Sequence, residues 1–154
     1  MKKLGFLLFP ALALGTGLWS ARLVGSSFTA LYLLLEKSPL FPPPSVFPVV
    51  WTILYILMGI GLACVVQRGG KGTGMAIFLW GSQLALNFSW SVLFFGYGAY
   101  WTALVCLGAL WVLILLMILS FHSVSRFAAW LQIPYFLWVS FAGYLNLMIC
   151  LLNP

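Results

Sequence analysis

The sequence has almost no acidic residues and few charges of any sign. Among 154 residues, Glu36 is the only carboxylate side chain, seven residues are Lys or Arg, and 64% are apolar. A soluble chain of average composition carries about 25% charged residues, whereas this chain carries 5%. Together with a mean hydropathy of +1.15, this composition indicates a membrane protein.

The groups that usually carry catalysis or hold metals are also scarce. His122 is the only histidine, and the three cysteines stand singly, with no Cys-x-x-Cys spacing. A catalytic metal or a ligated haem needs a cluster of such side chains, so we expect no metal site and no covalently bound cofactor. Serine-type hydrolysis lacks its base, and coupled proton transport lacks an ionisable group inside the apolar stretches.

The seven cations are separated by long apolar stretches and form no stripe that could follow phosphates, which excludes a nucleic-acid-binding function. The glycine-rich segment 69–74 lacks the spacing and the flanking strand of a nucleotide-binding loop. No internal repeat is visible, so a transporter built from two inverted halves has no support.

Five apolar stretches are each long enough to cross a bilayer as a helix. A hydrocarbon core of about 30 Å needs roughly 20 residues at about 1.5 Å each, and the stretches lack the alternation of barrel strands. They cover about 4–23, 47–66, 75–95, 101–121 and 127–151. We therefore predict an all-α integral membrane protein, a single domain over 1–154, with five transmembrane helices in one bundle.

The beginning of the chain, two lysines followed by an apolar run, imitates a secretory signal. The run is long enough to span, so we expect a retained signal-anchor helix. Five cations fall on the side of the N-terminus and two, Arg22 and Lys37, fall on the other side. This asymmetry predicts a cytoplasmic N-terminus and a C-terminus outside.

The longest connection, at about 24–46, joins the first two predicted helices. Its apolar first half can form a short interfacial helix, and Pro42, Pro43 and Pro44 then predict a stiff, extended strap. Such a long loop is typical of a lid or a binding element. The alternative is a surface cover that only seals the end of the bundle.

The third predicted helix has two distinct faces. One face carries Gln83, Asn87, Trp90 and Ser91 at helical spacing. Amides in a bilayer need partners, so this face should point into the bundle or toward a ligand. The opposite face includes Gly74, Phe78, Gly81 and Ala85. Its small residues allow close contact with another helix, and we expect a homodimer there, with packing inside one chain as the alternative.

Aromatic and amide side chains also align on the second and fifth helices. Trp51 and Tyr55 share a stripe on the second, and the stripe on the fifth contains Tyr135, Trp138, Ala142 and Asn146. The stripes suggest a common centre that binds an aromatic ligand. Alternatively, the amides only tie helices together and the rings fill space.

The order of these residues resembles the tryptophan-rich sensory protein family (TspO/MBR, translocator protein). The resemblance covers nearly the whole chain. It is carried by Pro42-Pro43, Phe47-Pro48-x-x-Trp51, Gln83-x-x-x-Asn87-x-x-Trp90-Ser91, Pro134-Tyr135-x-x-Trp138 and Ala142-x-x-Leu145-Asn146. It implies a five-helix bundle, usually homodimeric, that binds porphyrins and aromatic isoquinoline or benzodiazepine drugs in a pocket closed by the first loop.

The resemblance and the stripes together give a set of candidate ligand-binding residues. Trp51 and Trp138 match the tryptophans that the family associates with porphyrin handling, and Tyr32 and Pro42 fall in the lid. The full set is Tyr32, Pro42, Trp51, Tyr55, Gln83, Asn87, Trp90, Ser91, Tyr135, Trp138, Ala142, Leu145 and Asn146.

We therefore expect a receptor or sensor for porphyrins and aromatic drug-like ligands. Because no iron ligands are available, metal-free protoporphyrin should be preferred over haem. One alternative is light-dependent oxidative degradation of protoporphyrin, with Trp51 and Trp138 as the catalytic residues, and another is transport of porphyrin or lipid. The cholesterol motif proposed for vertebrate members requires a cation after Tyr144, and none follows, which argues against high-affinity sterol binding.

Overall fold

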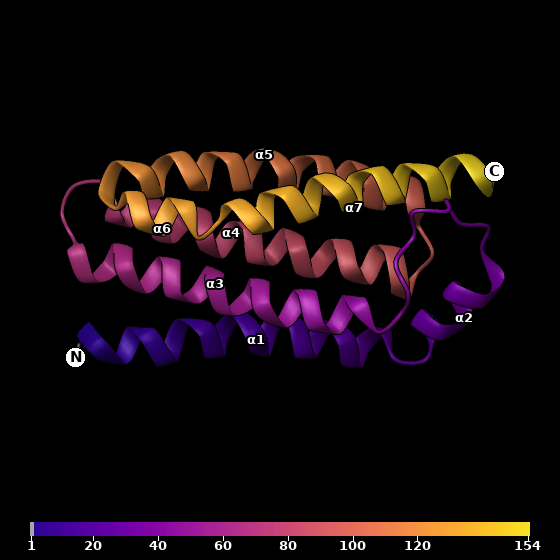
Figure 1. The fold of residues 1–154 in the computed structure, drawn as a ribbon, viewed down its shortest axis with the longest axis horizontal. Coiled ribbons are helices and arrows are strands. Elements are labelled where there is room, and N and C mark those ends of the chain that lie inside the picture. Colours follow the sequence, from indigo (N-terminus) through magenta and orange to yellow (C-terminus); the bar gives the residue numbers. More distant parts are fainter. Residues whose placement is uncertain (1) are drawn as a thin grey trace.

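The computed structural model describes residues 2–154, and these residues form helices, turns and connections without any β-strand. Long helices lie side by side, and the two termini lie at opposite ends of the bundle (Figure 1). Five helical spans are long and apolar enough to cross a membrane. The predicted fold class, an all-α multi-pass membrane bundle, is confirmed.

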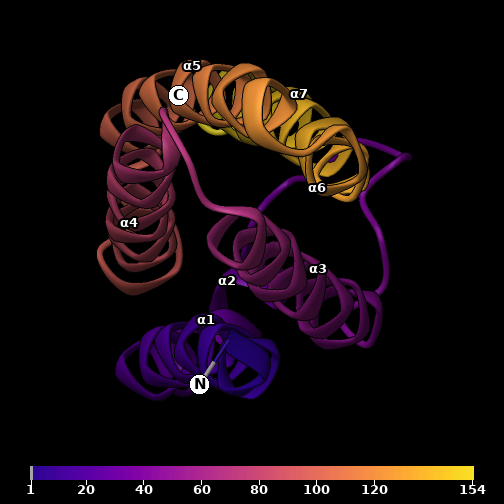
Figure 2. The same cartoon turned by 90° about the vertical axis from the view of Figure 1, so that its left-hand side faces the viewer.

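The first four spans begin and end close to charged or small residues. A short 3₁₀ turn, Lys2–Leu4, precedes α1. The spans are α1 (Gly5–Val24), α3 (Val46–Arg68), α4 (Thr73–Ser91) with its π-helical extension η2 (Val92–Gly96), and α5 (Tyr100–Val124). Viewed along the bundle, α1 lies on the opposite side from α5 and α7 (Figure 2).

The last span differs from the single helix predicted over 127–151. It consists of α6 (Arg126–Trp130) and α7 (Ile133–Leu152), which a turn at Leu131 and Gln132 separates. Pro134 lies in the first turn of α7, where its missing N–H costs no hydrogen bond. The Gln132 side chain donates from Nε2 to the carbonyl oxygens of Leu57 (3.2 Å) and Ala128 (3.3 Å), which ties the break to α3.

Two glycines of α3 allow neighbouring chain segments to come very close. A Cβ at Gly59 would lie 2.1 Å from the backbone nitrogen of Pro10, and a Cβ at Gly61 would lie 2.1 Å from Nε2 of Gln132. Without side chains at these positions, α3 packs directly on α1 and receives the Gln132 amide. The crossing of α1 and α3 therefore depends on backbone contact, as is common where small residues line a membrane helix interface.

The long connection between α1 and α3 contains a short helix, α2 (Ser27–Leu34), followed by an irregular segment, residues 35–45, which we call the strap. Both lie at the end of the bundle where the C-terminus lies (Figure 1). Three hydrogen bonds attach the strap to α7 and its end. Asn153 accepts at Oδ1 from the Glu36 N–H (3.0 Å) and donates from Nδ2 to the Glu36 carbonyl (2.9 Å), and the hydroxyls of Ser38 and Tyr144 lie 2.8 Å apart.

Candidate ligand-binding site

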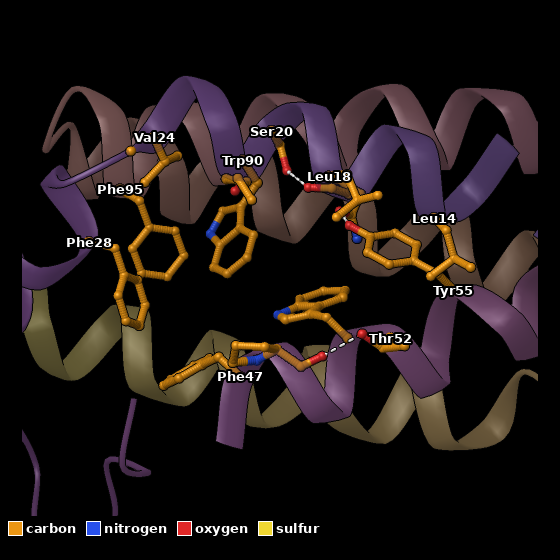
Figure 3. A pocket seen from close by; sticks show the side chains of 17 residues that line it. Leu14, Leu18, Ser20, Val24, Phe28, Phe47, Thr52, Tyr55, Trp90 and Phe95 are labelled. Carbon is orange, nitrogen blue, oxygen red and sulfur yellow. Dashed lines mark hydrogen bonds between the residues drawn. The ribbon is translucent and has the colours of Figure 1, made fainter. Parts of the chain in front are cut away.

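A cavity of about 350 Å³ lies between α1, α3 and α4, next to α2 (Figure 3). This volume is near the lower end of the roughly 300–1,000 Å³ found for small-molecule pockets. Most of the lining is apolar or aromatic, with a few hydroxyls and one amide. The lining residues are Leu14, Gly17, Leu18, Ser20, Ala21, Val24, Gly25, Phe28, Phe47, Pro48, Trp51, Thr52, Tyr55, Asn87, Trp90, Ser91 and Phe95.

Trp51 lies among other aromatic rings in the cavity wall. Its ring centroid is 5.6 Å from that of Tyr55, one turn further along α3. Trp90 on α4 and Tyr135 on α7 each lie 6.2 Å from Trp51. These separations are within the range of favourable aromatic contacts. Trp51 therefore connects the cavity with the aromatic core of the bundle.

Behind this wall, phenol and amide groups form one hydrogen-bonded chain. The Tyr55 hydroxyl donates to Oδ1 of Asn87 (2.8 Å), and Nδ2 of Asn87 donates to the Tyr135 hydroxyl (2.9 Å). Tyr135 in turn donates to Oε1 of Gln83 (2.6 Å), whose Nε2 lies 3.7 Å from the sulfur of Met58. All five side chains are buried. The chain supplies partners to polar groups that lipid cannot satisfy.

A second polar pair holds Trp90 in place. The indole N–H of Trp90 donates to Oδ1 of Asn146 (3.1 Å), and Nδ2 of Asn146 donates to the Tyr100 carbonyl (3.0 Å). Trp90 also stacks on Phe94 at 5.7 Å. Directly afterwards the backbone becomes the π-helix η2, where Phe95 lines the cavity. Such π-helical turns frequently occur at functional sites.

The structure places the predicted site residues in three groups. The first group lines the cavity: Trp51, Tyr55, Asn87, Trp90 and Ser91. The second lies directly behind the lining through the hydrogen bonds and ring contacts described above: Gln83, Tyr135 and Asn146. The third does not line the cavity: Tyr32, Pro42, Trp138, Ala142 and Leu145.

Trp138 is separated from the cavity by another aromatic ring. Phe47 lines the cavity and packs edge-on against Trp138, with ring centroids 6.0 Å apart. On its other side Trp138 contacts Phe141 at 5.7 Å. Its indole N–H is buried without a hydrogen-bond partner within residues 2–154. The two tryptophans expected around one hollow, Trp51 and Trp138, therefore do not share the cavity wall in this conformation.

Several residues that line the cavity were not among the predicted site residues. The first helix supplies a large part of the wall, and Phe28 of α2 and Phe47 of α3 close one end. A Cβ at Gly17 would lie 2.3 Å from the Tyr55 ring. Gly17 therefore leaves the space that the Tyr55 ring occupies against α1. In the sequence, the available signal for this contact was a glycine inside an otherwise apolar helix.

The face of α4 expected to contact a second copy is open in the single chain. The residues Gly74, Phe78, Gly81 and Ala85 are all exposed. No atom lies within 4 Å of a Cβ built at Gly74 or Gly81. Packing within one chain therefore does not cover these positions.

No group of three or more His, Cys, Asp or Glu side chains comes together within the part of the chain that the structure describes. Cys64, Cys106 and Cys150 form no disulfide with one another and lie on three different helices. The polar groups at the cavity are uncharged, and they suit a ligand held by ring stacking and neutral hydrogen bonds.

The fold and the cavity define a class of protein: a multi-pass integral membrane protein with an aromatic-lined pocket inside its helix bundle. The TspO/MBR family matches residues 6–152. The chain therefore belongs to the TspO/MBR family, as the resemblance in its sequence predicts.

Individual relatives agree with this assignment. The chain is 44% identical to the tryptophan-rich protein TspO of Chlorobaculum tepidum, over 84% of this chain and 87% of the relative. It is 35% identical to the tryptophan-rich sensory protein of Cereibacter sphaeroides, over 73% and 70% of the two chains. It is 34% identical to the translocator protein of Bos taurus, over 92% and 84%.

Replacing Tyr135 with Phe should destabilise the bundle. The substitution removes the acceptor of Asn87 and the donor to Gln83, and both amides are buried. Leaving buried polar groups without partners costs about 1–3 kcal/mol. We expect a decrease of that size in the free energy of unfolding, measured by chemical denaturation in detergent. Tyr97→Phe, at a side chain that is 78% exposed, is the matched control, and equal effects of both variants would contradict the role of the network.

Proposed function

We propose that this protein is a membrane receptor or sensor for porphyrins, metal-free protoporphyrin in particular, and for aromatic isoquinoline- or benzodiazepine-type ligands. The observation that carries the proposal is the apolar cavity in which Trp51 lies among three further rings. A flat π-system that stacks on such rings gains about 0.5–1.5 kcal/mol per pair beyond area burial. The name of the Cereibacter sphaeroides relative, a sensory protein, supports a sensing role.

The polar groups at the cavity support a metal-free ligand. The Asn87 amide and the Ser91 hydroxyl line the cavity and can face pyrrole nitrogens or a ligand carbonyl. The sole histidine, His122, is exposed in the last turn of α5 and does not line the cavity. Ligation of haem iron by histidine therefore has no support from this site.

Trp138 joins the proposed site when Phe47 turns aside. The cavity is small for a tetrapyrrole and ends at Phe47, behind which the Trp138 N–H has no partner among residues 2–154. Rotation of this one ring extends the cavity toward α7, where Ala142 and Leu145 lie. In the extended site the indole N–H can donate to a carboxylate or carbonyl of the ligand.

A titration of the purified protein with protoporphyrin tests this proposal. Trp51→Leu removes a stacking partner, so we expect its Kd to be roughly 2- to 13-fold higher than that of the unchanged protein. Absorbance and tryptophan fluorescence follow the binding in the dark. Trp130→Leu, at a lipid-facing side chain that is 70% exposed, is the control. Absence of saturable binding by the unchanged protein, or equal weakening by the control, would overturn the proposal.

Light-dependent degradation of bound protoporphyrin is the second candidate function. It is favoured by the contact of Trp51 with both the cavity and three oxidisable rings, because excited porphyrin next to indole exchanges electrons readily. The porphyrin is the group oxidised, and dissolved dioxygen is the oxidant. Illuminating the titrated samples distinguishes the two functions, since an enzyme converts more than one porphyrin per protein. In that case replacing both Trp51 and Trp138 with Phe should slow conversion, because both indoles border the extended site proposed above, and unchanged conversion would remove them from the mechanism.

We further propose that a second copy of the chain covers the open face of α4. Its small side chains permit close approach of two helices, and packing within one chain leaves them exposed. Ala85→Leu would add bulk to this face and shift the dimer to a monomer at equal detergent concentration. Ala109→Leu, at an exposed position on α5, is the control. Sedimentation analysis measures the mass, and an unchanged mass for Ala85→Leu would exclude this face.

The orientation that we propose places the N-terminus in the cytoplasm. The N-terminal end of the bundle also holds the α3–α4 turn and the α5–α6 junction (Figure 1), and these contain Arg68, Lys71 and Arg126. Cytoplasmic loops are richer in Lys and Arg. A membrane-impermeant amine reagent applied to intact cells should leave Lys3 and Lys71 unlabelled. Labelling of these two lysines would contradict the proposed orientation and place the N-terminus outside.

A further inference from the structure

The cationic end of the bundle contains a second pocket, far from the aromatic cavity. It has a volume of about 410 Å³ and lies between the end of α3 and the junction of α5 with α6, at the end of the bundle that carries the N-terminus (Figure 1). Its lining consists of Cys64, Gln67, Arg68, Ser125 and Phe127. None of these residues belongs to the ligand-binding site described above.

The chemistry of this lining fits a phosphate group. Arg68 contributes a guanidinium, whose planar fork of N–H groups matches phosphate oxygens. Ser125 is buried, and its Oγ accepts a hydrogen bond from the Ala128 N–H (3.4 Å). That bond leaves the hydroxyl proton of Ser125 able to donate to an anion. One charged donor and one neutral donor therefore border the same pocket.

No acidic side chain offsets the positive charge at this end. Glu36, the only one in the sequence, belongs to the strap at the opposite end of the bundle. Lys3, Lys71 and Arg126 are exposed at the same end as the pocket. The net side-chain charge at this end is therefore positive, and it attracts anions over about a Debye length.

The position of the pocket favours a phospholipid, and not a soluble anion, as its ligand. Arg68 ends a transmembrane helix and Arg126 begins another, so the pocket lies at the depth of the lipid headgroups. Two large apolar side chains of α6, Phe127 (62% exposed) and Trp130 (70% exposed), extend from the same region. They provide a surface for an acyl chain, which an inorganic ion would not need.

From these observations we infer that the pocket lined by Arg68 and Ser125 binds the phosphate of an anionic phospholipid, with the acyl chain against Phe127. Pockets of this kind between membrane helices on the cytoplasmic side are known to hold anionic headgroups. The inference does not depend on porphyrin binding, because it concerns different residues at the other end of the molecule.

The test compares two charge-neutralising variants at the same end of the bundle. The full-length protein is purified from micelles that contain equal amounts of phosphatidylglycerol and phosphatidylcholine, and the retained lipids are quantified by mass spectrometry. We expect the unchanged protein to enrich phosphatidylglycerol. Arg68→Gln should reduce that enrichment about tenfold, because a charge-assisted hydrogen bond is lost. Lys71→Gln changes the net charge equally, but Lys71 does not line the pocket, so it should keep the enrichment.

Two further arms distinguish lipid binding in the pocket from diffuse charge attraction and from binding of a free anion. Arg68→Lys keeps the charge and loses the planar fork, so a smaller but measurable reduction supports the pocket. The inference is overturned if the unchanged protein shows no preference between the two lipids. It is also overturned if Lys71→Gln and Arg68→Gln reduce the enrichment of phosphatidylglycerol equally, because that result would indicate diffuse electrostatic attraction. It is also overturned if millimolar inorganic phosphate displaces the lipid and stabilises the lipid-free protein against thermal unfolding, because the ligand would then be the free anion.

Discussion

The structure depends on one constraint: a polar group inside a bilayer must find its partner within the protein. The chain from Tyr55 through Asn87 and Tyr135 to Gln83 meets this constraint for three helices at once, since its members lie on α3, α4 and α7. Each hydrogen bond contributes only a modest free energy of stabilisation. A donor or acceptor left without a partner in hydrocarbon, however, destabilises the fold strongly. The network therefore fixes which faces of these helices point inward, and it positions the cavity wall as a result.

The polar side chains that connect the helices and line the cavity are uncharged, and this limits the kinds of ligand that the cavity can bind. A cavity lined by indole, phenyl and phenol rings with an amide and a few hydroxyls offers stacking and weak polar contacts but no counter-ion. Such a site discriminates by shape and ring area more than by charge. The relatives of this chain are named as sensory and translocator proteins, and the proposed binding of flat aromatic molecules is consistent with both names.

Much of the fold was predictable, because hydropathy alone determines which segments can cross a bilayer. The inward faces of the third and fifth spans were predictable as well, since Asn87 and Asn146 cannot face lipid without a partner. The cavity wall from α1 was not predictable, because an apolar side chain such as Leu14 looks the same whether it faces lipid or a cavity. The Phe47 ring lies between the cavity and Trp138, and helical spacing contains no information about side-chain rotation. The break before α7 was signalled only by Pro134, and its exact position follows from the tertiary bonds of Gln132.

The attachment of the strap has a practical consequence for the handling of the protein. The Asn153 side chain forms hydrogen bonds with both backbone groups of Glu36, which hold the strap to the end of α7. An affinity tag or fluorescent fusion joined next to Asn153 would therefore lie beside the hydrogen bonds that attach the strap. Purification handles are better placed at the N-terminus, at the far end of the molecule.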